Sequence, residues 1–352
     1  MIISKDGLVR LKIKSWQIVK FQYMCFKSVR VIRSELSTYR ETNSLRIPAL
    51  NRVIDISITP PGSLWNLNPT ISSNSNIYYR QTTGAFFPIA GLDGNPQIEN
   101  VSKEFKNATF KASISPNFEV EQITEVLPLS GDPCLEDLRV ISEGEKEYLV
   151  GTLVTSSSPK PWKSTVAIYD VQKHRTISLV SPFGYQIEKN WVPIDVSNGL
   201  VRILYSSNPL QVIEMDLNTG VQRNLIPVKQ SKSNLSGGSQ FVKLNNGEYL
   251  RVARKRFAVF NRGRIHLSYL VIHDANLIEI KRSRPFIFQT IGFEICNGLS
   301  LNKEGEIVFS WGENDRKMFL ATALLEDLLK WIEPEILEKP KYSIRKMHKL
   351  LK

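Results

Sequence analysis

The pattern of hydrophobic and polar positions changes near residue 48. Before that point, apolar and basic residues alternate without a boundary signal. After it, short apolar runs such as Val166–Tyr169, Val201–Tyr205 and Ile307–Trp311 alternate with clusters of Gly, Asn, Asp, Ser and Pro. β-branched and aromatic residues dominate the runs and turn residues bound them, which is typical of β-strands. The sequence therefore predicts a mainly β protein, with one helical exception: residues 318–332 are expected to begin as a strand and end as a helix before Pro334.

A weak repeat underlies this pattern. Five times, a polar, turn-rich entry leads into a strand, a turn and a second strand. The entries are anchored at Asn68, Asp137, Asn190, Gly238 and Asn297, which lie 69, 53, 48 and 59 residues apart. Three of the units carry a second hairpin, with Asp- and Asn-rich turns at 170–173, 216–220 and 273–276. Four strands repeated five times predict an all-β, five-bladed β-propeller, and the alternative is an irregular pair of β-sandwiches.

The charge of the chain lies mainly at its ends. The formal net charge of +12 suggests a nucleic-acid binder at first. However, residues 1–40 hold nine Lys/Arg and two acids, residues 338–352 hold six and one, and residues 41–337 are neutral overall. We therefore expect no nucleic-acid partner. The predicted organisation is a basic extension over 1–45, a catalytic propeller over 46–330 and a basic, helical tail over 331–352. The two basic ends are candidates for peripheral membrane contact, and frayed, solvated termini are the alternative.

Other chemistry is restricted by what the sequence lacks. Cys25, Cys134 and Cys296 are widely spaced, which indicates reduced thiols. The sequence has no long apolar run and no secretory signal, so we expect a cytoplasmic protein. It has no phosphate-binding glycine loop, no nucleophile elbow and no pair of histidines with metal-ligand spacing. We expect neither a metal nor a bound cofactor. The oligomeric state is left open.

The predicted fold brings the five entries together, because the first strand of each blade is usually innermost and lines a central channel. We expect one mouth lined by polar side chains from distant parts of the sequence: Asn68, Asp137, Arg139, Lys189, Asn190, Asn297 and Asp315. Such a mixture of carboxylates, amides and cations suits a sugar ring, with an aromatic face to cover its C–H surface. Trp191 lies beside one entry, although core packing is the commoner role of such a residue.

The order of the motifs resembles that of one propeller family. NPT…YYR, EDLRV, EKNW, GGS, SRPF…E…NGL and WGENDR follow one another between about residues 64 and 325. The series is similar to the β-mannoside phosphorylases and mannosidases of glycoside hydrolase family 130 and their mannosyltransferase relatives. The resemblance implies an enzyme that makes or breaks a glycosidic bond of a β-mannoside-like glycan. Its substrates would be an oligosaccharide or glycan, together with inorganic phosphate, a sugar phosphate or a nucleotide sugar in some reactions.

The resemblance also implies roles for individual residues. Asp137, in Glu136-Asp137-Leu138-Arg139, would be the general acid or base, with a pKa raised by burial or by Glu136. Asn68 and Arg80 would contact the sugar, and Asp315 would bind its hydroxyls. The remaining predicted substrate contacts are Glu136, Arg139, Lys189, Asn190 and Trp191, of which Lys189 matches the family pattern less closely.

The sequence departs from the family pattern in ways that leave the reaction open. Leu138 stands where the family has Pro, and no Arg/His cluster for phosphate is evident. Residues 173–175 lie in an expected outer hairpin. We interpret residues 254–256 as a solvated strand end, and the alternative is that they substitute for the phosphate-binding cluster. Hydrolysis would need a second carboxylate, for which Glu188 and Glu294 are candidates, with a structural or sugar-binding role as the alternative. Phosphorolysis, synthesis, hydrolysis and transfer all stay open, as does a non-catalytic glycan-binding propeller.

Overall fold

The computed structural model describes residues 46–47, 50–56, 65–90, 96–100, 106–130, 134–156, 163–225, 235–259 and 263–332. The expectations for the basic termini and for Cys25 concern residues outside these ranges. Within them, none of the helices is long and apolar enough to cross a membrane.

Five four-stranded antiparallel sheets make up the structure. Blade 1 contains β2 (Trp65–Ile71), β3 (Asn76–Thr82), β6 (Asn107–Ile114) and β7 (Val120–Ser130). Blade 2 contains β8 (Cys134–Glu143), β9 (Lys146–Ser156), β10 (Lys163–Asp170) and β11 (Arg175–Ser178). Blade 3 contains β12 (Val192–Ser197), β13 (Leu200–Ser207), β14 (Leu210–Asp216) and β15 (Gln222–Leu225). Blade 4 contains β16 (Val242–Lys243), β17 (Tyr249–Val259), β18 (Gly263–His273) and β19 (Glu279–Arg282). The hairpin β4 (Gly84–Ala90) and β5 (Pro96–Asn100) is inserted into blade 1.

Blade 5 is built from both ends of the described chain. β20 (Glu294–Leu301), β21 (Glu306–Glu313) and β22 (Lys317–Leu324) are its first three strands, and β1 (Arg52–Asp55) is the outermost. β1 pairs antiparallel with β22, from Arg52 opposite Thr322 to Asp55 opposite Phe319. A strand from before blade 1 thus completes the last blade, which joins the two ends of the ring.

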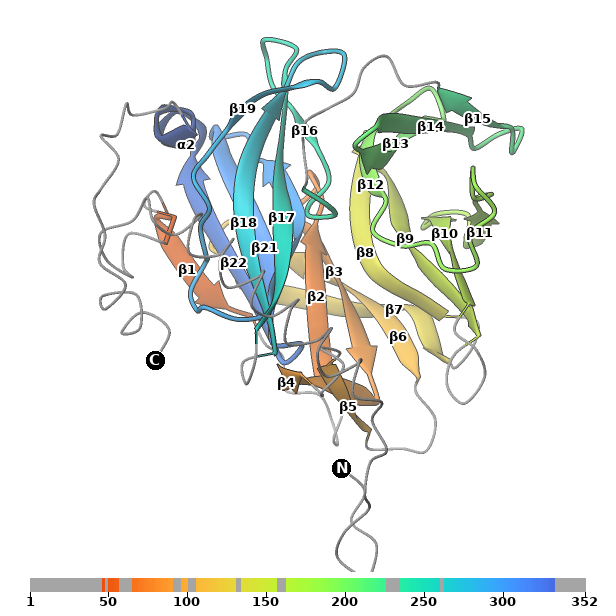
Figure 1. The fold of residues 1–352 in the computed structure, drawn as a ribbon, viewed down its shortest axis with the longest axis horizontal. Coiled ribbons are helices and arrows are strands. Elements are labelled where there is room, and N and C mark those ends of the chain that lie inside the picture. The colour runs from red at the N-terminus through yellow and green to blue at the C-terminus, as the bar shows by residue number, and fades with distance from the viewer. Residues whose placement is uncertain are drawn as a thin grey trace, which may run out of the picture.

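The inner strands form a closed ring. β2 contacts β8, β8 contacts β12, β12 contacts β16, β16 contacts β20, and β20 contacts β2 again. In Figure 1, β2 and β8 lie near the centre of the molecule, whereas β1, β11 and β15 lie at its edges. The predicted five-bladed β-propeller is therefore confirmed. The five pairs of strands that the repeat predicted are the first two strands of the five blades.

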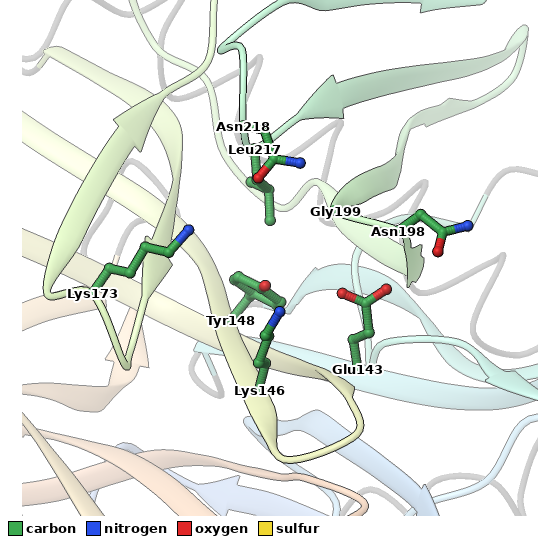
Figure 2. Close-up of a pocket in the computed structure, with 8 residues that line it drawn as sticks. All are labelled: Glu143, Lys146, Tyr148, Lys173, Asn198, Gly199, Leu217 and Asn218. Atoms are coloured by element: carbon green, nitrogen blue, oxygen red, sulfur yellow. The ribbon is translucent and has the colours of Figure 1, made fainter.

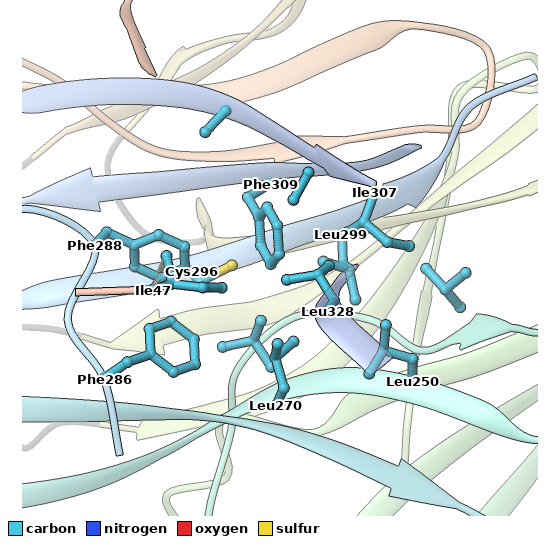
Figure 3. Close-up of a cluster of buried hydrophobic side chains, with 14 of the residues drawn as sticks. Ile47, Leu250, Leu270, Phe286, Phe288, Cys296, Leu299, Ile307, Phe309 and Leu328 are labelled. Atoms are coloured by element: carbon cyan, nitrogen blue, oxygen red, sulfur yellow. The ribbon is translucent and has the colours of Figure 1, made fainter. Parts of the chain in front are cut away.

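The hydrophobic core is divided among the interfaces between neighbouring blades. The largest cluster joins blades 4 and 5 and the helix α2 (Leu325–Ile332), as Figure 3 shows. Within it, Trp311 stacks on Phe288 with ring centroids 4.5 Å apart and on Phe319 at 5.3 Å. Leu328 and Ile332, one turn apart on α2, are both buried. Residues 317–332 are a strand followed by a helix, as predicted.

Candidate functional site

The inner strands share an irregularity at their polar entries. Asn68, Asp137, Asn190 and Gly238 have φ angles of 55°, 51°, 63° and 102°. The pairing register shifts at this point in blade 1, between Leu67 and Thr70, and in blade 2, between Glu136 and Arg139. A bulge of this kind changes the direction of a side chain, and Asn, Asp and Gly tolerate the left-handed conformation best. The anchors of the sequence repeat therefore occupy equivalent backbone positions in four blades.

The fifth anchor, Asn297, lies at a register shift of β20 without a positive φ. Its side chain is fully buried, and both polar atoms of its amide have no hydrogen-bond partner within the described part of the chain. Close packing surrounds it, because Gly298 lies so near β2 that a Cβ there would be 2.5 Å from the Ile71 nitrogen. Among the inner strands, the Gln240 Nε2 donates to the carbonyls of Ile71 and Leu299, both at 2.8 Å.

Asp137 and Glu136 lie at the centre of a polar network. The Asn68 Nδ2 donates to the Asp137 Oδ1 at 2.8 Å. The Arg80 Nη1 pairs with the Glu136 Oε1 at 3.0 Å, and Asn107 donates to the same oxygen at 3.3 Å. Both acidic residues are half-buried, whereas Asn68 and Arg80 are each 3% exposed. Blades 1 and 2 therefore hold two adjacent carboxylates on rigid neighbours while leaving them partly accessible.

Two further guanidinium groups, from blades 2 and 4, reach this network. The Arg139 Nε donates to the Gly238 carbonyl at 2.5 Å, and its Nη1 donates to the Asp137 carbonyl at 2.9 Å. The Arg254 Nη2 donates to the Asn190 Oδ1 at 2.8 Å. The Arg139 Nη2 and the Arg254 Nη1 are buried and have no hydrogen-bond partner among the described residues. These two nitrogens are therefore donors whose hydrogen-bonding capacity the described residues leave unused.

The cations keep Asp137 ionised. Burial alone would raise the pKa of Asp137, but the charges of Arg80, Arg139, Arg254 and Lys189 together lower it below its ordinary value. The expected raised pKa is therefore wrong for the free protein. For Glu136 the balance is opposite, because burial outweighs Arg80 and raises its pKa. Burial, followed by the charge of Arg254, also lowers the pKa of Arg139 to about 10.

Asp315 is the third carboxyl group of the cluster. It lies in the turn between β21 and β22 with a φ of 50° and is 3% exposed. Burial raises its pKa to about 7 against the opposing charge of Arg80, and the carboxylates of Asp137 and Glu136 raise it further. Its Oδ1 has no hydrogen-bond partner within the described ranges. The cluster thus combines an ionised carboxylate, Asp137, with a carboxyl group that carries a proton up to nearly neutral pH.

Three predicted site residues have well-defined structural surroundings. The Glu294 carboxylate accepts the backbone N–H groups of Phe288, Gln289 and Thr290, each within 2.9 Å. Glu188 accepts hydrogen bonds from Ser181, Trp191 and Tyr205. The Trp191 ring is 2% exposed and packs in the core between blades 2 and 3. Glu294 and Glu188 therefore stabilise loops, and Trp191 packs in the core. A structural role of this kind was the alternative prediction for each of them.

Lys189 lies beside the acidic cluster, whereas Arg254 departs from its interpretation in the sequence. Lys189 is exposed, and its charge acts on both Glu136 and Asp137. Arg254 is half-buried and bonded to Asn190, so the interpretation of residues 254–256 as a solvated strand end is wrong for Arg254. Arg256, two residues on, is exposed as expected. Arg254 pairs with Ser236, just before the Gly237-Gly238 entry, and this pairing sets it beside the entry of blade 4.

A measurable pocket lies elsewhere in the molecule. It has a volume of about 250 Å³ and lies among turns of blades 2 and 3, where Glu143, Lys146, Tyr148, Lys173 and Asn218 surround it, as Figure 2 shows. These turns are at the ends of the strands opposite to the polar entries. Among the residues that the structure describes, no three His, Cys, Asp or Glu side chains come together as metal ligands. Cys134 and Cys296 are buried free thiols, as predicted.

Comparisons with known proteins support the fold. No protein-family model and no curated protein matches the sequence. Among solved structures, a mannose phosphorylase from Leishmania mexicana, in complex with phosphate ion, superposes with a TM-score of 0.55 at 10% identity, covering 90% of this chain and all of the other. A GDP-Man-dependent mannosyltransferase from the same organism superposes with a TM-score of 0.54 at 11% identity, covering 89% of this chain and 99% of the other.

A glycosyl hydrolase from Bacteroides ovatus gives a TM-score of 0.50 at 13% identity, with 82% of this chain and 93% of the other covered. Identities this low carry information about the fold and not about the reaction. The resemblance noted in the sequence is confirmed at that level: the chain has the five-bladed β-propeller fold of mannoside phosphorylases and mannosyltransferases.

Proposed function

We propose that this protein is a carbohydrate-active enzyme that makes or breaks a glycosidic bond of a β-mannoside-like glycan, with Asp137 as the general acid/base. One observation carries the proposal: the entries of the blades bring Asp137, held by Asn68, together with two other carboxyl groups and four cationic side chains at the centre of a propeller. Fold similarity to enzymes of mannoside chemistry supports the substrate class.

The ionised state of Asp137 suits it to act as the general base in the bond-forming direction. An ionised carboxylate can accept the proton of an acceptor hydroxyl while that oxygen attacks the anomeric carbon of a donor sugar and the donor's leaving group departs with the bonding electrons. In the reverse reaction the same carboxyl group returns the proton to the leaving oxygen. Asn68 fixes the orientation of the carboxylate, and Asp315 and Glu136 are available to bind sugar hydroxyls.

The cations favour a co-substrate that carries phosphate. The sequence showed no phosphate-binding cluster, but the fold gathers Arg80, Arg139, Arg254 and Lys189 around Asp137. The unpartnered nitrogens of Arg139 and Arg254 can donate charge-assisted hydrogen bonds, which bind phosphate oxygens well. We therefore propose inorganic phosphate, a sugar phosphate or a nucleotide sugar as the second substrate. Phosphorolysis and transfer are favoured over hydrolysis, because Glu188 and Glu294 are occupied by structural hydrogen bonds.

A donor screen tests this proposal. The protein is incubated with mannose 1-phosphate or GDP-mannose plus manno-oligosaccharides, and separately with manno-oligosaccharides plus phosphate, and products are detected by mass. Growth or shortening of the oligosaccharide by one sugar is expected in one arm. Binding of oligosaccharides without any mass change would instead identify a non-catalytic glycan-binding propeller and contradict the enzyme.

A further inference from the structure

A group of exposed apolar side chains lies on the segment that leads from blade 2 into the polar site. Residues 179–191 connect β11 to β12 and end in Lys189, Asn190 and Trp191. Along this segment Val180 is 71% exposed, Phe183 53%, Tyr185 61% and Ile187 49%. Large apolar side chains that are grouped on a surface commonly mark a binding site.

The segment is fixed in place by its own hydrogen bonds. The Ser181 Oγ accepts the backbone N–H groups of Phe183 and Tyr185 and donates to the Glu188 Oε1. The Glu188 carboxylate also accepts from Trp191 and Tyr205. Backbone hydrogen bonds of Gln186 and Glu188 to Ser164 attach the segment to the start of β10. The two exposed rings are therefore held on a preorganised support.

The rings form one end of a continuous row of aromatic side chains. Phe183 lies 5.7 Å from Tyr185 and 5.6 Å from Tyr205, and Tyr205 lies 5.0 Å from the buried Trp191, measured between ring centroids. Trp191 directly follows Asn190, which is bonded to Arg254, and Lys189 acts electrostatically on Asp137. The row thus runs from the surface to the core between blades 2 and 3, and the backbone of the same segment continues into Lys189 and Asn190 at the polar cluster.

We propose that Phe183 and Tyr185 form a stacking platform for a further sugar unit of the glycan, beyond the unit that reacts at Asp137. The inference rests on the proposed function. Aromatic faces bind the C–H surface of a pyranose, and fixed rings bind with little loss of conformational entropy. The continuity of the platform with Lys189 and Asn190 points to the same oligosaccharide as its ligand, so the substrate is a chain of several sugars rather than a single sugar or a disaccharide.

The test compares substrates of different length in Phe183→Ala and Tyr185→Ala. KM for a long manno-oligosaccharide should rise about tenfold in each variant, with kcat unchanged, whereas kinetics with the shortest active oligosaccharide should stay at the wild-type value. Phe183→Tyr and Tyr185→Phe keep the rings and should keep the affinity. Val180→Ala is the matched control, because it shortens an exposed apolar side chain of the same segment without removing a ring.

The outcomes separate the two proposals. If KM in every variant equals the wild-type value at every chain length, the platform is overturned and the proposed enzyme activity is unaffected. A wild-type protein that neither turns over nor binds any manno-oligosaccharide would overturn both. Sedimentation tests whether the exposed side chains make a contact between protein molecules instead. If the wild type self-associates, and Val180→Ala and Phe183→Ala abolish this equally, the platform is also overturned.

Discussion

Asp137 keeps its negative charge because several cations, contributed by three blades and by the segment before blade 3, outweigh the cost of its burial. Arg80 belongs to blade 1, Arg139 to blade 2 and Arg254 to blade 4, while Lys189 precedes blade 3. Asp315 has the same chemical group and a neighbouring position, yet burial dominates there and raises its pKa to about 7. Two carboxyl groups with pKa values moved in opposite directions are a common arrangement in acid–base sites.

Asp137→Asn should reduce turnover by a factor of about 10² to 10⁴, because the amide cannot carry the proton that is transferred. The substitution is isosteric, and Asn68 can still donate to the amide oxygen, so the circular dichroism of the variant should match that of the wild type. Initial rates and circular dichroism on the same preparations check both statements. A variant that retains the wild-type rate would remove Asp137 from the mechanism.

Asp315→Asn should change how stability depends on pH. The folded protein keeps a proton on Asp315 up to about pH 7, whereas the unfolded chain loses it near the ordinary pKa of 3.8. The unfolding free energy therefore falls as pH rises between these values, and this contribution is absent in the variant.

Urea unfolding at about pH 5 and about pH 8 measures the effect. The wild type should lose more stability than Asp315→Asn on going to the higher pH. Glu294, whose pKa burial also raises to about 7, is present in both proteins and cancels in the difference. An identical pH dependence in the two proteins would mean that Asp315 is ionised throughout this range.

At the scale of single elements, the entry of blade 4 shows how backbone conformation positions the site. Gly238 has a φ of 102°, and a Cβ at this residue would lie 1.9 Å from the Val252 carbonyl oxygen of β17. The Gly238 carbonyl accepts the hydrogen bond of the Arg139 Nε, and the Gly237 carbonyl accepts one from the buried Arg251. The glycine pair thus allows the entry to approach β17 closely and to bind both arginines.

Gly238→Ala should destabilise the protein by about 3 kcal/mol, because the methyl group combines a clash with an unfavourable φ. Gly247→Ala is the matched control: its φ is 84°, but no atom lies within 4 Å of a Cβ there. The control should therefore show only the smaller cost of the backbone conformation. Denaturant unfolding of both variants measures the difference, and equal losses would show that close packing at Gly238 contributes nothing.

At the scale of the whole molecule, the ring depends on a strand from the start of the described chain. Ile56 follows β1, donates its backbone N–H to the Met318 carbonyl at 2.9 Å and is 7% exposed. Its side chain packs with Ile71 of blade 1 and Leu320 of blade 5, so it joins the first and last blades. Removing apolar side-chain volume at Ile56 should therefore weaken the closure of the propeller.

Ile56→Ala should cost about 3 kcal/mol, as truncation of a buried Ile usually does. Val53→Ala, on the same strand, should cost less than about 0.5 kcal/mol because Val53 is 43% exposed. Thermal and denaturant unfolding give both values. A cost near zero for Ile56→Ala would indicate that the ring is stable without this contact.

Much of the architecture could be predicted because it depends on short stretches of sequence. Each blade needs its own apolar runs and its own turn residues, and the anchors Asn68, Asp137, Asn190 and Gly238 are residues that the bulged entry requires. A strand as short as β1 has no such pattern, so its place in blade 5 could not be predicted. The same is true of Arg254, which looks like one of three exposed basic residues until its strand is set beside the entry of blade 4.

The sequence by itself determined the fold class and the number of blades, because turns, strand periodicity and repeats are short-range properties. It also predicted that Asn68, Asp137 and Asp315 lie in one polar cluster. Only the tertiary structure decided which carboxyl group is ionised and which cations act on each carboxyl group. Those properties depend on burial and on charges that blades contribute from distant parts of the chain. Electrostatic energy depends on distance in space, and distance in space between such residues is fixed only when the ring closes.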